Sequence, residues 1–201
     1  IAQDSLEEGA PFLGQDISQL YETVEGAPPR LVCVLPNGTR YTQACTAGTV
    51  NQANVNRFNP VHRAISADGQ KIYWSDKANV PGKIYVRVGG AETFQVSNTV
   101  AQFWTASADR TKALYSKGST LYRYHLQALA STPIPGEVGG VMGASEDADL
   151  VYLVSEEDLA EGGEAGKPNL YLYDAQADSF TFIAALSADE GQSVTLGRIP
   201  T

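Results

Sequence analysis

The sequence predicts an all-β protein built from repeated units of about four short strands. A strand-turn-strand stretch occurs three times, starting from Ser66, Ser107 and Ser145, at spacings of 41 and 38 residues. Ten Tyr and nineteen Gly fall in many short runs, which is typical of sheets joined by tight turns. Helical signals are nearly absent, since residues 124–130, the clearest candidate, are short and uncapped.

The turn inside each copy follows a Ser-x-Asp pattern. In the first copy Asp68-Gly69 separates two apolar runs, and Asp-Gly supplies the positive-φ residue that a hairpin turn uses. In the later copies Arg110 and Ala148 replace the glycine, so those turns need another geometry or a strained left-handed residue. A period near 40 residues indicates a radial or stacked β-repeat in which each unit buries its faces against its neighbours.

A second motif, an apolar residue followed by Tyr, comes after the hairpin at matching offsets and also precedes all three hairpins. Its four copies are Leu20-Tyr21, Ile84-Tyr85, Leu121-Tyr122 and Leu170-Tyr171. With both motifs the chain resembles the TolB-like family of β-propeller repeats, whose units pair an S-x-D-G hairpin with a following L-Y strand. The resemblance covers roughly residues 18–187 and is best at 64–75. It implies blades of four strands and a surface or funnel that docks other proteins.

We therefore expect one β-propeller domain or fragment over residues 1–201, with a partial blade at 5–45, blades at about 61–97, 98–136 and 138–187, and a C-terminal strand at 191–201. Residues 20–24 and 30–35 are expected strands, and polar residues 46–60 are an expected connector. Pro133 and Pro135 place the last strand of their blade at a sheet edge. Since a propeller needs about four blades to close, we expect this segment to belong to a larger one.

Charge and hydropathy exclude some partners. The net charge of −9 would repel nucleic acid, and no apolar run is long enough to span a bilayer. The chain begins at Ile1 rather than Met, so we expect a processed piece. Cys33 and Cys45 are the only cysteines, which allows one disulfide or two buried thiols. A bridge requires the chain to curl back after Thr42, and it would indicate an extracellular, periplasmic or cell-surface location.

Catalytic signals are weak. His62 and His125 are the only histidines and both lie at strand ends, and no Gly-x-Ser-x-Gly elbow occurs. We expect no catalytic residue, no metal centre and no cofactor. The aromatic residues recur at repeat positions, which favours packing between blades over a sugar-binding platform.

The longest insertion within the full repeats, residues 156–168, is rich in Gly and acids and is expected to stand off the scaffold as an exposed binding loop. Its carboxylates are Glu156, Glu157, Asp158, Glu161 and Glu164. They lack the spacing of a known calcium loop, which favours a hydrated surface over a calcium site.

The sequence as a whole predicts a non-catalytic protein-binding or scaffold propeller of a secreted, periplasmic or surface bacterial protein. Its expected partner is another protein or further repeats of the same precursor. Two alternatives stay open: an accessory propeller domain of a larger hydrolase of the prolyl-oligopeptidase type, and a structural repeat of a surface appendage.

Overall fold

The computed structural model describes residues 6, 17–49, 63–78 and 80–187, and this part of the chain contains fourteen strands and no helix. The strands are β1 (Tyr21–Glu22), β2 (Arg30–Leu31), β3 (Thr46–Ala47), β4 (Lys71–Ser75), β5 (Ile84–Val88), β6 (Glu92–Gln95), β7 (Gln102–Ala106), β8 (Lys112–Lys117), β9 (Thr120–His125), β10 (Ala130–Glu137), β11 (Gly140–Ala144), β12 (Leu150–Ser155), β13 (Asn169–Asp174) and β14 (Ser179–Ala185).

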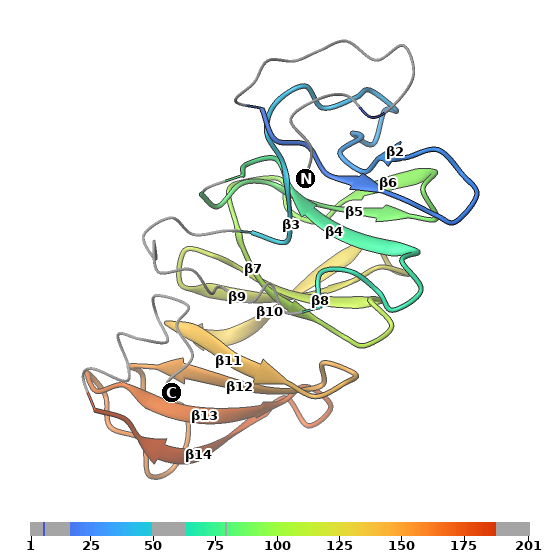
Figure 1. The fold of residues 1–201 in the computed structure, drawn as a ribbon. Coiled ribbons are helices and arrows are strands. Elements are labelled where there is room, and N and C mark those ends of the chain that lie inside the picture. The colour runs from blue at the N-terminus through green and yellow to red at the C-terminus, as the bar shows by residue number, and fades with distance from the viewer. Residues whose placement is uncertain (1–5, 7–16, 50–62, 79, 188–201) are drawn as a thin grey trace.

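These strands form three four-stranded antiparallel sheets, each a simple meander in chain order: β3 to β6, β7 to β10 and β11 to β14. A two-stranded sheet, β1 with β2, precedes them. The three sheets follow one another through the molecule as successive blades (Figure 1). The prediction of an all-β propeller segment with four-stranded blades is confirmed by this arrangement. The expected C-terminal strand at 191–201 lies outside the described residues.

Each hairpin between the first two strands of a blade is held by the same Ser-Asp contact. Ser107 Oγ donates to Asp109 Oδ1 at 2.7 Å. Ser107 Oγ also accepts a hydrogen bond from the Lys112 amide at 3.0 Å. The Asp carboxylate in turn accepts the backbone amide of Thr111 at 3.0 Å. The first and third blades repeat these contacts at their own serines. A two-residue side-chain spacing thus satisfies the turn's backbone donors three times.

The glycine of this turn is replaceable in the structure. Gly69, Arg110 and Ala148 have φ values of 69°, 58° and 56°, so all three are left-handed. Of the two options that the sequence left for the later turns, the left-handed residue is therefore the one adopted. For Arg and Ala this region is unfavourable, because the Cβ crowds the backbone.

The apolar-Tyr pair packs in two directions, because successive residues of a strand point to opposite faces. Ile84 lies in the cluster shared with the second blade, whereas Tyr85 stacks on Trp74 at 4.5 Å on the preceding side. Leu121 and Tyr122 divide in the same way between the third and first blades. Each pair thereby connects three consecutive layers, and the inter-blade packing role expected for these aromatic residues is confirmed for them.

The first full blade differs from its expected range of 61–97. Its first strand is split, because Ala47 pairs with Trp74 while the Ala64 carbonyl accepts the amide of Tyr73. In the second blade one unpaired residue, Trp104, separates the two equivalent pairs. Ala47 and Ala64 therefore correspond to Phe103 and Thr105, which one bulge residue separates in the second blade. Thr46 and Ala47 were expected in a connector, and the reason for the miss is that a two-residue strand has no readable periodicity.

The N-terminal segment covers the rear face of the first blade. Cys33 and Cys45 form a disulfide with a Cα–Cα distance of 6.5 Å, which supports the bridged alternative. Both cysteines pack with Trp74 and Ile72 in one buried cluster. The Tyr41 amide donates to the Cys33 carbonyl, so the chain turns back before it reaches Cys45. Packing and bridge together close this end of the blade stack.

The strand of the second blade that contains two prolines lies at the position that their missing amides predict. β10 pairs only with β9 and lies at the outer edge of the sheet, as Pro133 and Pro135 predict. Its register shifts between Pro133 and Glu137, where the missing amides would otherwise interrupt a ladder.

Candidate functional site

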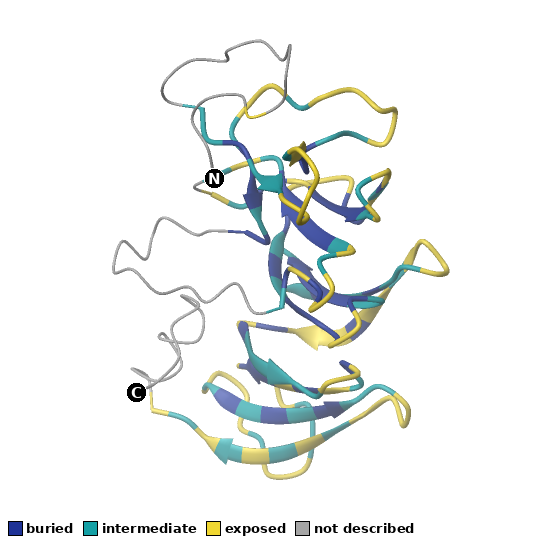
Figure 2. Ribbon diagram, turned by 45° about the vertical axis from the view of Figure 1, so that its right-hand side comes forward, coloured by how far each residue is buried: buried dark blue, intermediate teal, exposed yellow. Residues whose placement is uncertain are grey.

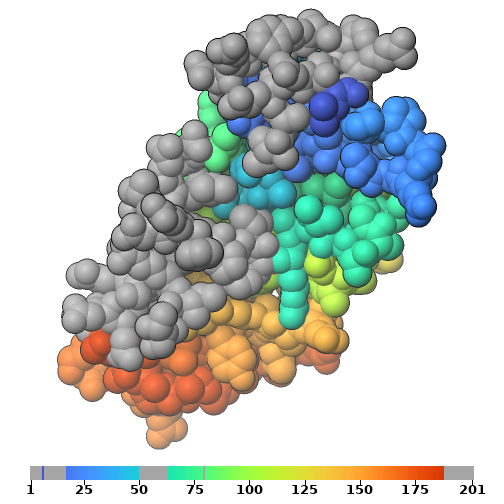
Figure 3. All heavy atoms as spheres, viewed as in Figure 1, coloured from blue at the N-terminus to red at the C-terminus, as the bar shows by residue number. Residues whose placement is uncertain are grey.

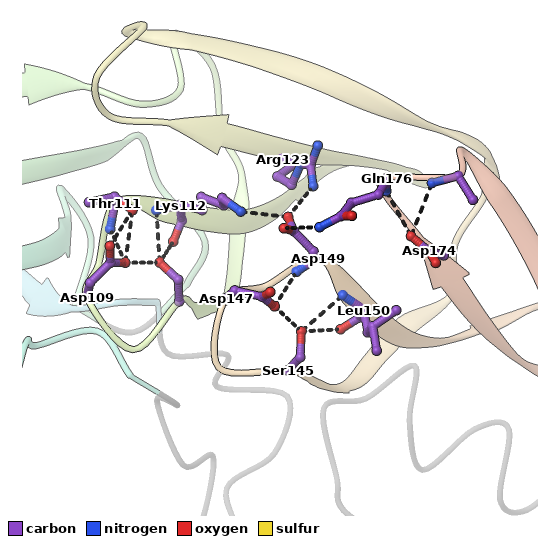
Figure 4. A network of polar contacts seen from close by, with 12 residues as sticks. Asp109, Thr111, Lys112, Arg123, Ser145, Asp147, Asp149, Leu150, Asp174 and Gln176 are labelled. Atoms are coloured by element: carbon purple, nitrogen blue, oxygen red, sulfur yellow. Dashed lines mark hydrogen bonds and ion pairs between the residues drawn. The ribbon is translucent and has the colours of Figure 1, made fainter.

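A polar network joins the hairpin ends of the second and third blades (Figure 4). Asp149 accepts from Lys112 Nζ at 2.6 Å and from Arg123 Nη1 at 2.7 Å, and all three side chains are at most 24% exposed. Gln176 Nε2 lies 3.4 Å from the other carboxylate oxygen. Two cations and an amide thus converge on one carboxylate, which makes this a bridge between sheets rather than an open charged site.

His125 lies beside this bridge. Burial, together with the nearby Arg123 and Lys112, lowers its pKa, while Asp149 acts in the opposite direction. A lowered pKa keeps the imidazole neutral at pH 7, and in the described chain no nucleophilic side chain is hydrogen-bonded to it. His62 lies outside the described residues. In the described ranges no three His, Cys, Asp or Glu side chains gather as they would around a metal ion, and no helix there could cross a membrane.

The acidic loop of residues 156–168 is folded onto its blade, so the expectation that it stands off the scaffold is wrong. Leu159 and Ala160 pack against the core between the second and third blades. The Tyr171 hydroxyl donates to the Glu157 carbonyl at 2.8 Å, and the buried Asn169 amide donates to the Glu164 and Lys167 carbonyls at 2.9 and 2.7 Å. Sequence reasoning missed this because it weighed the loop's glycines and charges and not its one Leu.

The five carboxylates of the loop do not form one cluster. Glu157 accepts the Glu137 amide at 2.8 Å, and Glu164 pairs with Lys167. Glu156, Asp158 and Glu161 are exposed. A binding role for the loop stays a prediction, and it now rests on these last three side chains.

The outer face of the third sheet is the largest departure from the repeat pattern. Tyr73, Leu114 and Tyr152 each stand seven residues after the hairpin serine, and their exposed fractions are 0%, 0% and 42%. Leu150 and Ile183 on the same sheet are 38% and 46% exposed. We call this surface, formed by Leu150, Tyr152, Leu170, Leu172 and Ile183, the terminal face. Figure 2 shows the exposed positions on the last sheet, and Figure 3 shows that sheet at the far end from the blue N-terminal segment.

A small cavity lies between the first strands of the second and third blades. Its lining residues are Arg63, Trp104, Thr105, Val141, Met142, Gly143 and Ala144. Arg63, Trp104 and Met142 each stand three residues before the hairpin serine of their own blade. The convergence of one repeat position from three blades was missed at the sequence level, although counting back from the three serines would have found it.

No protein-family model matches the chain, and no curated protein does. A solved TolB candidate from Agrobacterium tumefaciens is 19% identical with a TM-score of 0.46, and 62% of this chain and 45% of that one are covered. An oligogalacturonate lyase in complex with manganese is 17% identical with a TM-score of 0.46 and coverage of 84% and 47%. The Vibrio parahaemolyticus oligogalacturonate lyase is 13% identical with a TM-score of 0.47, and 84% of this chain and 47% of that one are covered.

The chain therefore spans just under half the length of these solved structures. At such identities no activity transfers from them. The fold assignment rests on the chain's own three sheets.

Proposed function

We propose that this chain is a non-catalytic scaffold segment of a larger propeller assembly, and that its terminal face receives a further four-stranded blade. The observation that carries the proposal is Tyr152, 42% exposed at the repeat position where Tyr73 and Leu114 are fully buried against a following sheet. Soluble proteins rarely expose such a contiguous apolar surface without a partner.

The two ends of the described stack support the proposal by their difference. The rear face of the first blade is covered by the disulfide-bonded segment, which buries Trp74 and Ile72 to 0% and 4% exposure. The terminal face has no such cover in the described residues. A repeat array generally carries a specialised cap at an end that faces water. A face without a cap is therefore suited to another blade, supplied by the same precursor or by another copy of the chain.

The bonded Cys33 and Cys45 support a secreted, periplasmic or cell-surface setting, because disulfides persist in oxidising compartments. The non-catalytic assignment rests on the described cavity, which holds an arginine, aromatic and aliphatic groups but no paired acid and base.

Sedimentation velocity of the 201-residue chain over a hundredfold concentration range tests the proposal. We expect reversible association at the higher concentrations. The variant Tyr152→Lys/Leu172→Lys places two charges on the terminal face and is expected to stay monomeric. A matched control, Gln127→Lys/Ala128→Lys, adds two charges at exposed positions of the β9–β10 turn, outside the terminal face, and should leave association unchanged. A compact wild-type monomer at every concentration, melting cooperatively and identically to the charged variant, would refute the proposal.

The acidic loop is proposed as an additional contact surface for a protein partner. Because Leu159 and Ala160 belong to the core, replacing the whole loop would damage the fold. The sharper variant is Glu156→Gln/Asp158→Asn/Glu161→Gln, which removes three exposed charges and keeps the packing. Unchanged binding of a partner isolated from the source would exclude a role for the loop.

A further inference from the structure

The cavity between β7 and β11 has a volume of about 160 Å³. It lies where the first strands of two blades run side by side, and both strands are irregular there. The register shifts between Phe103 and Thr105 in β7, and between Val141 and Gly143 in β11. Trp104 and Met142 are the bulged residues. A bulge turns a side chain out of the regular alternation, and such irregularities are common beside binding sites.

Arg63 completes the wall from the first blade. It directly precedes Ala64 in the first strand of that blade, and its φ is 58°. Its Nη1 donates to the Ser145 carbonyl at 3.1 Å, which fixes the guanidinium at the third-blade side of the cavity. A non-glycine residue in this conformation is strained and persists where its surroundings require it.

The guanidinium of Arg63 keeps unused donor capacity. It carries five N–H donors, and in the described chain it donates one hydrogen bond, to a backbone carbonyl and not to a carboxylate. A second guanidinium, Arg110, is nearby: burial and then Arg63 lower the pKa of Arg110. The Nη atoms of Arg110 donate to the carbonyls of Ser107, Ala108 and Ile65, while its buried Nε has no partner in the described chain. Asp109 and Asp68 act on the pKa of Arg110 in the opposite direction, whereas the lining of the cavity contains the Arg63 guanidinium and no carboxylate.

The remaining wall is apolar and partly preformed. Trp104 Nε1 donates to Ser116 Oγ at 3.0 Å, so the indole is anchored by one edge. Val141, Met142 and Ala144 add aliphatic surface. Gly143 belongs to the lining, and a side chain at this position would meet no atom within 4 Å of its Cβ.

We propose that this cavity binds a carboxylate attached to a compact apolar group of about amino-acid size. The carboxylate accepts from the open N–H groups of Arg63, in the two-bond geometry that a guanidinium offers. The apolar group lies against Trp104 and Met142. The volume corresponds to about five water molecules at roughly 30 Å³ each, well below that of a drug-sized site. This inference is independent of the proposed docking of a further blade.

The same chemistry can come from a free small acid or from the C-terminal residue of a polypeptide. Isothermal titration with 4-methylpentanoate, its amide, the tripeptide Ala-Ala-Leu and its C-terminal amide separates the sources. We expect each acid to bind at least tenfold more tightly than its amide. A tighter tripeptide assigns the site to polypeptide ends, and a tighter 4-methylpentanoate assigns it to free acids; either supports the proposal.

Two variants test the assigned residues. Arg63→Gly removes the guanidinium while its left-handed φ suits glycine, so the melting temperature should be unchanged or higher and acid binding at least tenfold weaker. Gly143→Val adds a branched side chain to the lining of the cavity and should abolish binding of both acids. Lys83→Gln removes a charge at an exposed position outside the cavity and is the control. Equal binding of acid and amide, no binding at millimolar concentration, or unaltered binding by Arg63→Gly would overturn the inference.

Discussion

Leu114 and Tyr152 occupy the same repeat position in neighbouring blades, yet Leu114 is 0% exposed and Tyr152 is 42% exposed. Leu114 packs among Leu153 and Val151 of the following sheet. Tyr152 has no following sheet in the described chain. The two residues occupy equivalent positions, and their exposure differs because only Leu114 is covered by a following sheet.

This relationship predicts unequal costs for truncation. Leu114→Ala should lower the free energy of unfolding by about 2–5 kcal/mol, because it leaves a cavity between two blades. Tyr152→Ala, measured at a dilution where the chain is monomeric, should lower it by less than about 1 kcal/mol. Urea denaturation of both variants gives the two values. Equal losses would mean that the terminal face is packed within the monomer.

The disulfide should stabilise the N-terminal cover of the first blade. It closes a loop between positions 12 apart in the sequence, which corresponds to about 3 kcal/mol in the chain-entropy account. Reductant should therefore lower the melting temperature of the wild type and leave that of Cys33→Ser/Cys45→Ser unchanged. Intact mass after alkylation without reduction should show no modified cysteine. Two alkylated thiols in protein isolated from its source would contradict the oxidising-compartment assignment.

The hairpin aspartates predict an acid-dependent loss of stability. The hydrogen bond from Ser107 lowers the pKa of Asp109 to about 2, and the Thr111 donors add to the effect. The unfolded chain has its ordinary Asp pKa near 3.9, so it takes up the proton first as the pH falls. The stabilisation is therefore complete above about pH 4 and is lost as the pH falls toward about 2.

NMR titration of the Asp109 carboxyl carbon measures this shift. Ser107→Ala removes the hydroxyl donor and should raise the pKa of Asp109 toward its ordinary value. Thr111→Val keeps the Ser107 bond and serves as the comparison. A pKa near 3.9 for Asp109 in the wild-type protein would show that the Ser-Asp contact is absent in solution.

Leu129 offers a test of backbone strain that is separate from packing. Its φ is 49° and its side chain is 54% exposed, so the side chain gives little burial in return for the left-handed conformation. Leu129→Gly should raise the free energy of unfolding by about 1 kcal/mol. Lys117→Gly, at a half-buried residue that precedes the left-handed Gly118, gains no such relief and should destabilise the β8–β9 hairpin. A destabilised Leu129→Gly variant would contradict the assigned conformation.

The sequence predicts the parts of this fold that have a local physical cause. Ser66, Ser107 and Ser145 reveal the hairpins because a hydroxyl and a carboxylate two residues apart satisfy a turn's donors wherever they occur. The apolar-Tyr pairs reveal the sheet faces because strand alternation forces the two residues apart.

The remaining features depend on contacts between distant segments. Thr46 and Ala47 join the first blade only because Trp74 and Ser75 lie opposite them. The cavity exists because bulges in two strands and Arg63 from a third segment meet there. Leu159 and Ala160 pack the acidic loop against the core between the second and third blades. Such pairings have no signature within one segment, and repeat alignment could have located only the bulge positions.

Site-specific photocrosslinking tests most directly whether the terminal face binds a further blade, as we claim. p-Benzoylphenylalanine in place of Tyr73 is the positive control, because Tyr73 contacts the second blade through Phe103 and Arg110. It should crosslink within the chain. p-Benzoylphenylalanine in place of Tyr152 should yield a covalent dimer of the isolated chain, or a crosslink to the following repeat in a longer precursor. Crosslinks from position 152 that stay within one 201-residue chain, or none at a concentration where Tyr73 crosslinks fully, would contradict the claim.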